Sequence, residues 1–482
     1  MQETGESGAQ LLPLTYGVEL EYLFVVDKKK VVNDQKYHFL LPKHFVLDKD
    51  DQVGNAHDFD PKGAEHRGLC QAAMLLRRSR VDLAMKLFPK NDDSIFSRWS
   101  LTTESAVVHP GGSKEKAALA TQMNVAPGSL KQCELTGIEL ISPILLAPDM
   151  RAQQYLSGGS FDELDHVLMA TNQKGLPCTF IAGPKTTSVH VHVGLQPDRD
   201  GVPRDIPLDV CQHLAWLIVA FEDLITLLHH PERHAYVGTK SYSMCKSSRH
   251  AMGDIIGHTC DKVPAFDPWK AFDSIFRAES HLELRKVMGN DPSWGSRYTT
   301  VNFLHIAASP GYGDEIKTIE FRQHCGTGNA IEIKEWVYFL SSLFHAAERK
   351  ANESIEFDSY ELDNYLVAWP DIERAKYDSI FSIPKRTMRE LFDLMELPVA
   401  RREYWYERAK FFRSEKFAHY YAGNTCEPEC TGTMPRDAQG WAEDEVIEQP
   451  WGPPRRPPSP ITDTSSWSET SNTTPSSDGQ SC

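Results

Sequence analysis

The sequence contains no apolar run long enough to span a bilayer, and residues 1–12 carry neither a cationic start nor an apolar segment. We therefore expect no membrane span and no secretory signal, and we interpret residues 1–12 as a flexible leader. The ten cysteines are scattered and form no disulfide framework. Cys426 and Cys430 have no companion pair for a zinc site. This cysteine usage is typical of a reducing compartment, so we expect a cytoplasmic protein.

The chain also has fewer basic residues than acidic residues. The 482 residues include 51 lysines and arginines against 67 acidic residues, a net charge of −16. This balance argues against nucleic-acid binding as the main function. Residues 421–482 hold ten acidic residues against three arginines, and proline, serine and threonine fill the end of the chain. We interpret residues 424–482 as a disordered acidic tail and residues 13–423 as the folded domain.

The stretch from Tyr16 to Val25 alternates with a period of two residues, with apolar residues on one side and Glu19 and Glu21 on the other. This pattern predicts a β-strand with one core face and one acidic face. The two carboxylates would stand about 6.6 Å apart, where like charges repel by roughly 2–3 kcal/mol at an effective dielectric constant of about 20. A bound cation explains the arrangement, and a solvent-exposed outer face is the plainer alternative.

Two later stretches repeat this design. In 137–143 the pattern places Glu139 opposite the apolar residues of a short strand that ends at a proline. In 186–195 the alternation is complete and places His190 and His192 opposite a row of valines. Both patterns predict strands with one apolar face and one ionisable face.

A fourth strand is predicted as the second arm of a hairpin. Residues 297–309 and 316–324 would pair across the turn-forming sequence at 310–314. In the second arm we expect Ile319 and Phe321 to face the core. The other face of that arm would carry Thr318, Glu320, Arg322 and His324.

Helical periodicity marks the segments between these strands. Residues 207–230 carry an apolar stripe at steps of three and four, with a proline where a first helical turn tolerates one. Residues 68–88 and 330–350 also predict helices.

If the four strands lie in one sheet, their polar faces gather seven ionisable side chains in one hollow: Glu19, Glu21, Glu139, Glu320, His190, His192 and Arg322. Carboxylates with a few imidazoles suit Mg²⁺ or Mn²⁺, and an arginine beside them suits phosphate. This combination is typical of nucleotide-driven phosphoryl transfer. Each part also has a plainer interpretation, as surface histidines, a structural Glu320–Arg322 ion pair or a solvated Glu139.

At these residues the chain resembles the amidoligase family of the carboxylate–amine ligase superfamily, which is similar to glutamate–cysteine ligase and glutamine synthetase. The resemblance covers residues 14–350 and rests on four motifs in order: Gly17-Val18-Glu19-Leu20-Glu21, Gly137-Ile138-Glu139-Leu140-Ile141-Ser142-Pro143, His190-Val191-His192-Val193-Gly194 and Thr318-Ile319-Glu320-Phe321-Arg322. Arg297-Tyr298 and Asn302 resemble the family's motif before the last strand.

The resemblance implies an α+β fold in which helices surround a curved, mainly antiparallel sheet that holds ATP and Mg²⁺ (or Mn²⁺). The metal ligands that it implies are Glu19, Glu21, Glu139, His190 and Glu320. It also implies nucleotide contacts from His190, His192 and Arg322, and catalytic roles for Arg322, Glu139 and Arg297.

One segment departs from the family's pattern. Where the family has a tryptophan followed by Asp-Gly-Ser, this chain has Trp99 and then Thr103-Glu104-Ser105. Glu104 would replace the aspartate with a longer side chain and without the glycine that follows it.

The resulting hypothesis is an ATP-dependent carboxylate–amine ligase that forms an amide through an acyl phosphate. The partners expected are small-molecule carboxylate and amine substrates, with no nucleic acid and no membrane. Two alternatives stay open. His190, His192 and a carboxylate would form the metal triad of an oxygenase or hydrolase. Alternatively, the altered Glu104 segment would mark a catalytically silent relative that binds nucleotide.

Overall fold

The structure is a computed structural model that describes residues 11–52, 63–86, 97–107, 116–117, 119–120, 127–147, 160–183, 187–230, 233, 245, 247–255, 268–289, 299–307, 316–353, 385–386, 388–413 and 449–450. The expectations for residues 1–10, for Arg297 and for nearly all of the acidic tail lie outside these ranges. Within the tail, only Gln449–Pro450 (β11) is described, and it pairs with Lys385–Arg386 (β10).

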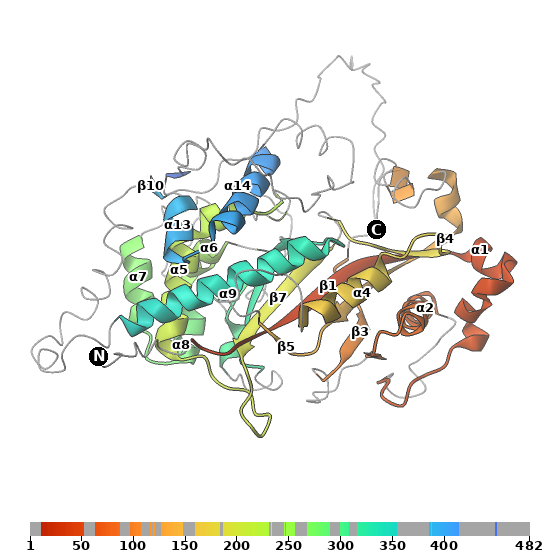
Figure 1. Ribbon diagram of the computed structural model, residues 1–482, viewed down its shortest axis with the longest axis horizontal. Helices are drawn as coiled ribbons and strands as arrows, with labels where there is room; N and C mark the ends of the chain where they lie inside the picture. The colour runs from red at the N-terminus through yellow and green to blue at the C-terminus, as the bar shows by residue number, and fades with distance from the viewer. Residues whose placement is uncertain are drawn as a thin grey trace, which may run out of the picture.

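A nine-stranded sheet organises the described part of the chain (Figure 1). Its strands follow the order β2 (Leu83–Met85), β3 (Trp99–Thr103), β4 (Cys133–Ile141), β1 (Leu14–Asp27), β7 (Ser188–Leu195), β9 (Ile319–Cys325) and β8 (Val301–Asn302). Every pair in this sheet is antiparallel except β2–β3. The prediction of a mainly antiparallel sheet with packed helices is thus confirmed.

The sheet is open and uncurled, with β2 and β8 at the ends of its path. The curvature that we expected is therefore wrong. These end strands have three and two residues and do not pair with each other, so the sheet stays open.

The central strand β1 is 14 residues long and is paired along both edges. On one edge β4 is followed by β5 (Leu145–Leu146), and on the other β7 is preceded by β6 (Cys178–Ile181). Because both edges are covered, the backbone groups of β1 find partners along the strand, and the strand is held between its neighbours.

Helices cover one face of the sheet. In Figure 1, α9 (Ala330–Asn352) crosses this face beside α4 (Ser160–Thr171), and α2 (Ala64–Arg78) lies over the end near α1 (Lys28–Asn33). The remaining helices gather at the opposite end: α5 (Leu208–Leu227), α6 (Ser248–Ile255), α7 (Pro268–Phe276), α8 (His281–Val287), α13 (Met388–Leu394) and α14 (Val399–Arg413). Short 3-10 turns occupy Gln35–Leu40, Pro42–His44, Pro127–Gln132 and Leu304–Ile306.

The two faces of β1 enter different environments. The side chains of Val18, Leu20 and Phe24 are at most 1% exposed and belong to the main apolar core under these helices. On the opposite face, Leu23 and Val25 belong to a small separate apolar cluster. Glu19 and Glu21 occupy the same face nearer the start of the strand, so the polar part of this face lies next to that small cluster.

The helix predicted for residues 68–88 is too long. Helix α2 ends at Arg78, and Arg80 then takes a left-handed conformation with φ of 65°, which a continuing helix does not allow. Leu83–Met85 instead forms β2 beside β3. Apolar residues at this spacing fit either structure, so periodicity alone did not separate the two.

Strand β9 contains a β-bulge. Val189 pairs with His324 whereas Val191 pairs with Phe321, so β9 has one residue more than β7 over this step. The extra residue turns His324 to the helix-covered face, where it is fully buried and its ring centroid lies 6.4 Å from that of Trp336. The prediction that His324 shares the polar face of its strand is therefore wrong, because a period of two fails across a bulge.

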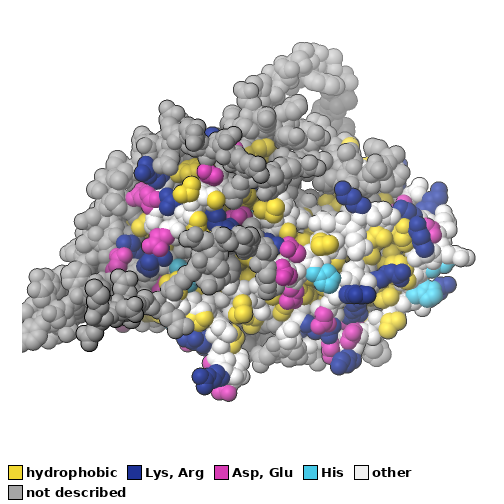
Figure 2. Space-filling model, viewed as in Figure 1, with side chains coloured by type: hydrophobic (Ala, Val, Ile, Leu, Met, Phe, Trp, Pro, Cys, Tyr) yellow, Lys and Arg dark blue, Asp and Glu magenta, His cyan; other side chains and the backbone are white. Residues whose placement is uncertain are grey.

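The surface in Figure 2 is the helix-covered side of the molecule. Basic, acidic and apolar side chains are interspersed among its described residues, and no continuous basic patch forms there. None of the described helices combines the length and the apolar composition needed to cross a membrane.

Candidate metal and phosphate site

The order β4-β1-β7-β9 places the four polar strands side by side, although they lie far apart in the sequence. The register aligns their ionisable residues. Glu21 is opposite Glu139 across β1–β4, and Glu19 is opposite His190 across β1–β7. The next pair in the sheet, His192 on β7 and Glu320 on β9, completes the row.

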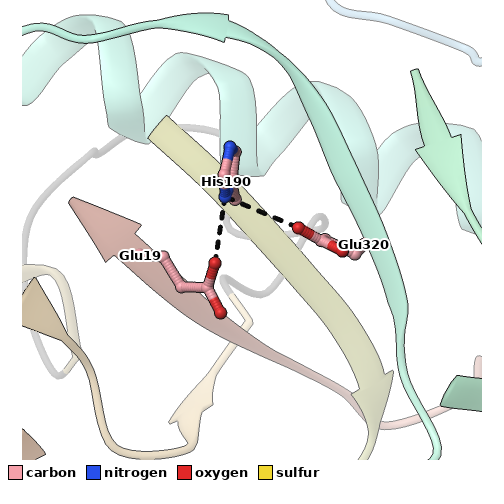
Figure 3. A group of neighbouring side chains, drawn as sticks. All are labelled: Glu19, His190 and Glu320. Atoms are coloured by element: carbon pink, nitrogen blue, oxygen red, sulfur yellow. Dashed lines mark hydrogen bonds and ion pairs between the residues drawn. The ribbon is translucent and has the colours of Figure 1, made fainter. Parts of the chain in front are cut away.

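His190 is the centre of this row and is only 2% exposed. Figure 3 shows the carboxylates of Glu19 and Glu320 converging on its ring from the strands on either side. The Nδ1 atom lies 3.0 Å from Oε2 of Glu19 and 3.5 Å from Oε1 of Glu320.

The protonation of Glu19 decides which nitrogen of His190 carries hydrogen. Burial alone would raise the pKa of Glu19, but His192 and His190 hold that pKa well below its usual range. An ionised carboxylate only accepts hydrogen bonds, so Nδ1 of His190 donates to Glu19. In the neutral imidazole, Nε2 then carries the lone pair.

That Nε2 atom is buried and has no hydrogen-bond partner among the residues that the structure describes. Its closest charged neighbour is Oε1 of Glu21 at 3.7 Å, and Glu139 completes this side of the ring. A lone pair directed at two carboxylates requires a proton or a cation between them. This position is therefore built to accept a positive charge.

Glu139 also requires a proton or a cation near its carboxylate. Its burial, together with the negative charges of Glu19, Glu104, Glu21 and Glu320, raises its pKa well above the usual range. Without a cation, Glu139 therefore retains its proton more readily than an exposed glutamate does.

Glu104 lies at the margin of this acidic group. It follows β3, whose Thr102 is directly opposite Glu139, so alternation places Glu104 on the same face of the sheet. Burial raises the pKa of Glu104, the Ala106 amide lowers it, and the charge of Glu21 adds to the increase. The Glu104 carboxylate accepts the backbone N–H of Ala106 at 2.5 Å and lies close enough to Glu21 and Glu19 for their charges to raise its pKa.

Glu320 lies at the opposite end of the row of ionisable residues. Its carboxylate accepts hydrogen bonds from the guanidinium of Arg322 and from the side-chain amide of Asn302, the latter at 2.8 Å. Burial opposes ionisation, but the charge of Arg322, together with those of His192 and His190, lowers the pKa of Glu320 to about 2. Arg322 is thus a largely shielded cation beside the carboxylates, with 12% of its side chain exposed.

His192 contacts Glu19 on one side and Thr318, at the edge of the site, on the other. Its Nε2 lies 3.0 Å from Oε1 of Glu19, and its Nδ1 lies 3.2 Å from the hydroxyl of Thr318. Burial opposes the charged form, but Glu19 raises the pKa of His192. The ring of His305 lies 5.9 Å away, and burial followed by the charge of His192 lowers the pKa of His305.

Within the described part of the chain, two sets of ligand atoms lie close enough to hold an ion. In each set, the atoms offered by the three residues are within 4.8 Å of one another. The outer set is Glu19, His190 and Glu320, and the inner set is Glu21, Glu139 and His190. Oxygen ligands with one imidazole suit Mg²⁺ or Mn²⁺, so the donor atoms and the unpartnered Nε2 both fit such a cation.

The structure thus brings together all the predicted site residues that it describes: Glu19, Glu21, Glu139, His190, His192, Glu320 and Arg322. Arg297 lies outside the described residues. His305 was not anticipated, because it follows β8 in a 3-10 turn that has no strand periodicity.

Comparisons of this chain with family models, curated proteins and solved structures found no match.

Proposed function

We propose that this protein is an ATP-dependent carboxylate–amine ligase whose catalytic domain spans residues 13–423. The observation that carries the proposal is the convergence of five metal-binding candidates and one arginine on a single buried face of the sheet. Glu19, Glu21, Glu139, His190 and Glu320 would hold Mg²⁺ or Mn²⁺. Such ions neutralise phosphate oxygens and polarise the transferring phosphoryl group.

Each residue of the site would have a role that follows from its position. His190 belongs to both ligand sets. Its Nε2 would bind a cation beside Glu21, and its Nδ1–H orients the carboxylate of Glu19. Arg322 would bind the γ-phosphate through its guanidinium, beside the carboxylate of Glu320. His192, which lies between Glu19 and the rim, would contact the nucleotide.

The reaction that follows has two steps. A carboxylate oxygen of the acid substrate attacks the γ-phosphorus, and ADP leaves with the electrons of the broken P–O bond. The nitrogen of the amine then attacks the acyl carbon, phosphate departs and the nitrogen loses a proton. The buried hollow serves the first step because fixed charges act more strongly where water is excluded.

The ligand sets favour this chemistry over an oxygenase or hydrolase. A facial triad requires two histidines and one carboxylate. Each set found among the described residues has one histidine and two carboxylates, and His192 belongs to neither. Oxygen-rich sets of this kind are typical of Mg²⁺ and Mn²⁺ rather than of iron or zinc.

The test is a screen for ADP release from Mg²⁺ and ATP with mixtures of amino acids, polyamines and ammonia. We expect turnover that requires both the cation and an amine. Glu19→Ala and Arg322→Ala should each lower turnover by about 100-fold or more. Glu335→Gln is the matched control, since Glu335 is a buried glutamate paired with Arg401 away from the site.

Three results would contradict the proposal in different ways. Unchanged turnover in both alanine variants would remove the site from the reaction. Bound iron or zinc together with ATP-independent activity would favour the oxygenase or hydrolase. Nucleotide binding without turnover under any substrate mixture would identify a catalytically silent relative.

A further inference from the structure

A buried carboxylate on α5 ties together two segments behind the ligand groups. Glu222 is 5% exposed and accepts hydrogen bonds from the hydroxyl of Ser247 (2.7 Å) and from the backbone N–H groups of Ser248 (2.5 Å) and Arg249 (3.1 Å). These donors lie at the start of α6, so Glu222 caps that helix. A fourth donor, the hydroxyl of Thr300 at 2.9 Å, comes from the segment before β8.

Thr300 in turn holds the main chain of Arg322. Its carbonyl accepts the backbone N–H of Arg322 at 2.9 Å, which extends the β8–β9 pairing by one residue beyond Val301. Arg322 lies at the bulge, where the pairing of β9 with β7 is interrupted. Its position therefore depends on the β8 side more than that of an ordinary strand residue does.

The other backbone group of Arg322 is held from the same side. Its carbonyl accepts a hydrogen bond from the guanidinium of Arg233 at 2.6 Å. With both backbone groups fixed, the side chain of Arg322 leaves the bulge in one direction, toward Glu320.

We propose that Glu222 is a positioning residue: through the hydroxyl of Thr300 it fixes the backbone of Arg322, so that the guanidinium reaches Glu320 and a γ-phosphate together. This inference rests on the proposed function, because that function supplies the phosphate. A carboxylate satisfies all four donors at once, whereas a glutamine amide would turn N–H groups toward some of them. A shift of the guanidinium by about 1 Å is enough to weaken an interaction that depends on alignment.

The test compares two nucleotides on the full chain by isothermal titration calorimetry, each with Mg²⁺. One is the β,γ-imido analogue of ATP, which carries a γ-phosphate, and the other is ADP, which lacks it. Thr300→Val removes the hydroxyl and keeps the carbonyl. We expect its Kd for the analogue to rise about tenfold while its Kd for ADP stays within about twofold.

Three further variants separate positioning from folding. Thr300→Ser keeps the hydroxyl and should bind both nucleotides as the parent protein does. Glu222→Gln should reproduce the selective loss of Thr300→Val. Ser247→Ala removes a hydrogen bond of similar length to the same carboxylate but leaves Thr300 in place, so it should retain the affinity for the analogue.

The inference is overturned if Thr300→Val binds both nucleotides as the parent protein does. It is also overturned if Thr300→Val and Thr300→Ser weaken both nucleotides equally, since that result describes a general loosening of the fold. A parent protein that binds neither nucleotide refutes the proposed function and this inference with it, and that result is recognised before any variant is made.

Discussion

Glu21 and Glu139 lie directly opposite each other in the antiparallel pair of β1 and β4, on the face of the sheet that carries His190. Like charges in such a pair destabilise a sheet. The pKa of Glu139 is raised, first by burial and then by the negative charges of its acidic neighbours, so ionisation of Glu139 is disfavoured. The unpartnered Nε2 of His190 lies beside the same two carboxylates. The fold is thus locally unfavourable at this point until a positive charge is present.

Replacing Glu139 by glutamine should relieve that conflict. We expect Glu139→Gln to raise the free energy of unfolding of the metal-free protein by about 1 kcal/mol and to abolish most of the stabilisation that Mn²⁺ gives the parent protein. Calorimetric melting with chelator and with Mn²⁺ measures both effects. Glu134→Gln on the same strand is the control: Glu134 pairs with Arg67, so this variant should be less stable yet respond fully to Mn²⁺. An undiminished response in Glu139→Gln would contradict the inner ligand set.

The pH dependence of stability should differ between two buried glutamates that both pair with arginine. The pKa of Glu320 falls from 4.5 to about 2 in the folded protein, because the charges of Arg322, His192 and His190 together outweigh the effect of burial. Its stabilisation is therefore complete above pH 4.5 and is lost as the pH falls toward 2. We expect Glu320→Gln to lower the free energy of unfolding by about 3 kcal/mol at neutral pH, and by progressively less in more acidic solution.

The contribution of Glu335 to stability should change with pH in the opposite direction to that of Glu320. Burial raises its pKa despite the charge of Arg401, so its contribution is greatest at low pH and declines as the pH rises through the folded pKa. Urea unfolding of Glu320→Gln and Glu335→Gln across an acidic pH series should therefore give differences from the parent protein that change in opposite directions. Parallel curves would show that Arg322 does not stabilise the ionised form of Glu320.

Substitution of His190 on β7 and of His324 on β9 should have different effects on Mn²⁺ affinity. His324 packs against Trp336, and burial followed by the charge of Arg408 lowers its pKa to about 3. We expect His324→Phe to leave Mn²⁺ affinity within about twofold, while His190→Phe should lower it by about 100-fold or more. Titration with Mn²⁺, followed by electron paramagnetic resonance, checks both values. Weakened binding in His324→Phe would mean that the helix-covered face contributes to the site.

Much of this site could be predicted because its strands follow a simple period. The alternation in β1 and β7 places Glu19, Glu21, His190 and His192 on one face without any knowledge of the partner strands. The period fails in β9, because a bulge depends on how a distant strand pairs and leaves no local mark in the sequence. His324 was misplaced for that reason.

Residues outside the regular elements were harder to place. Glu104 follows the end of β3, and His305 lies in a turn after β8. His305 has no repeating pattern that would indicate which way its side chain points, and the alternation that places Glu104 helps only once the pairing of β3 with β4 is known. The pairing of Glu21 with Glu139 was equally hidden, since the two strands that carry them are joined through more than one hundred residues of intervening chain. A sequence pattern predicts a face, whereas the register between distant strands depends on packing of the whole sheet.

Gly137 offers a test of how the Glu104 segment is held against the site. It lies on β4, where a Cβ atom would come within 2.1 Å of the carbonyl oxygen of Glu104 and 2.9 Å of Cβ of Val107. The Gly137 carbonyl also accepts the backbone N–H of Glu104 at 3.0 Å. This close approach exists only because the residue is a glycine.

Gly137→Ala must therefore displace the backbone at Glu104, since a carbonyl cannot rotate aside as the end of a flexible side chain can. We expect the free energy of unfolding to fall by about 1–3 kcal/mol, and the Mn²⁺ affinity to change because the carboxylate of Glu104 moves relative to Glu21 and Glu139. Gly128→Ala is the matched control, because a Cβ there meets no atom within 4 Å. Calorimetry and Mn²⁺ titration of the two variants separate the effects. A Gly137→Ala protein that loses stability but binds Mn²⁺ as the parent does would show that Glu104 contributes to the packing of the sheet and has no influence on the ion.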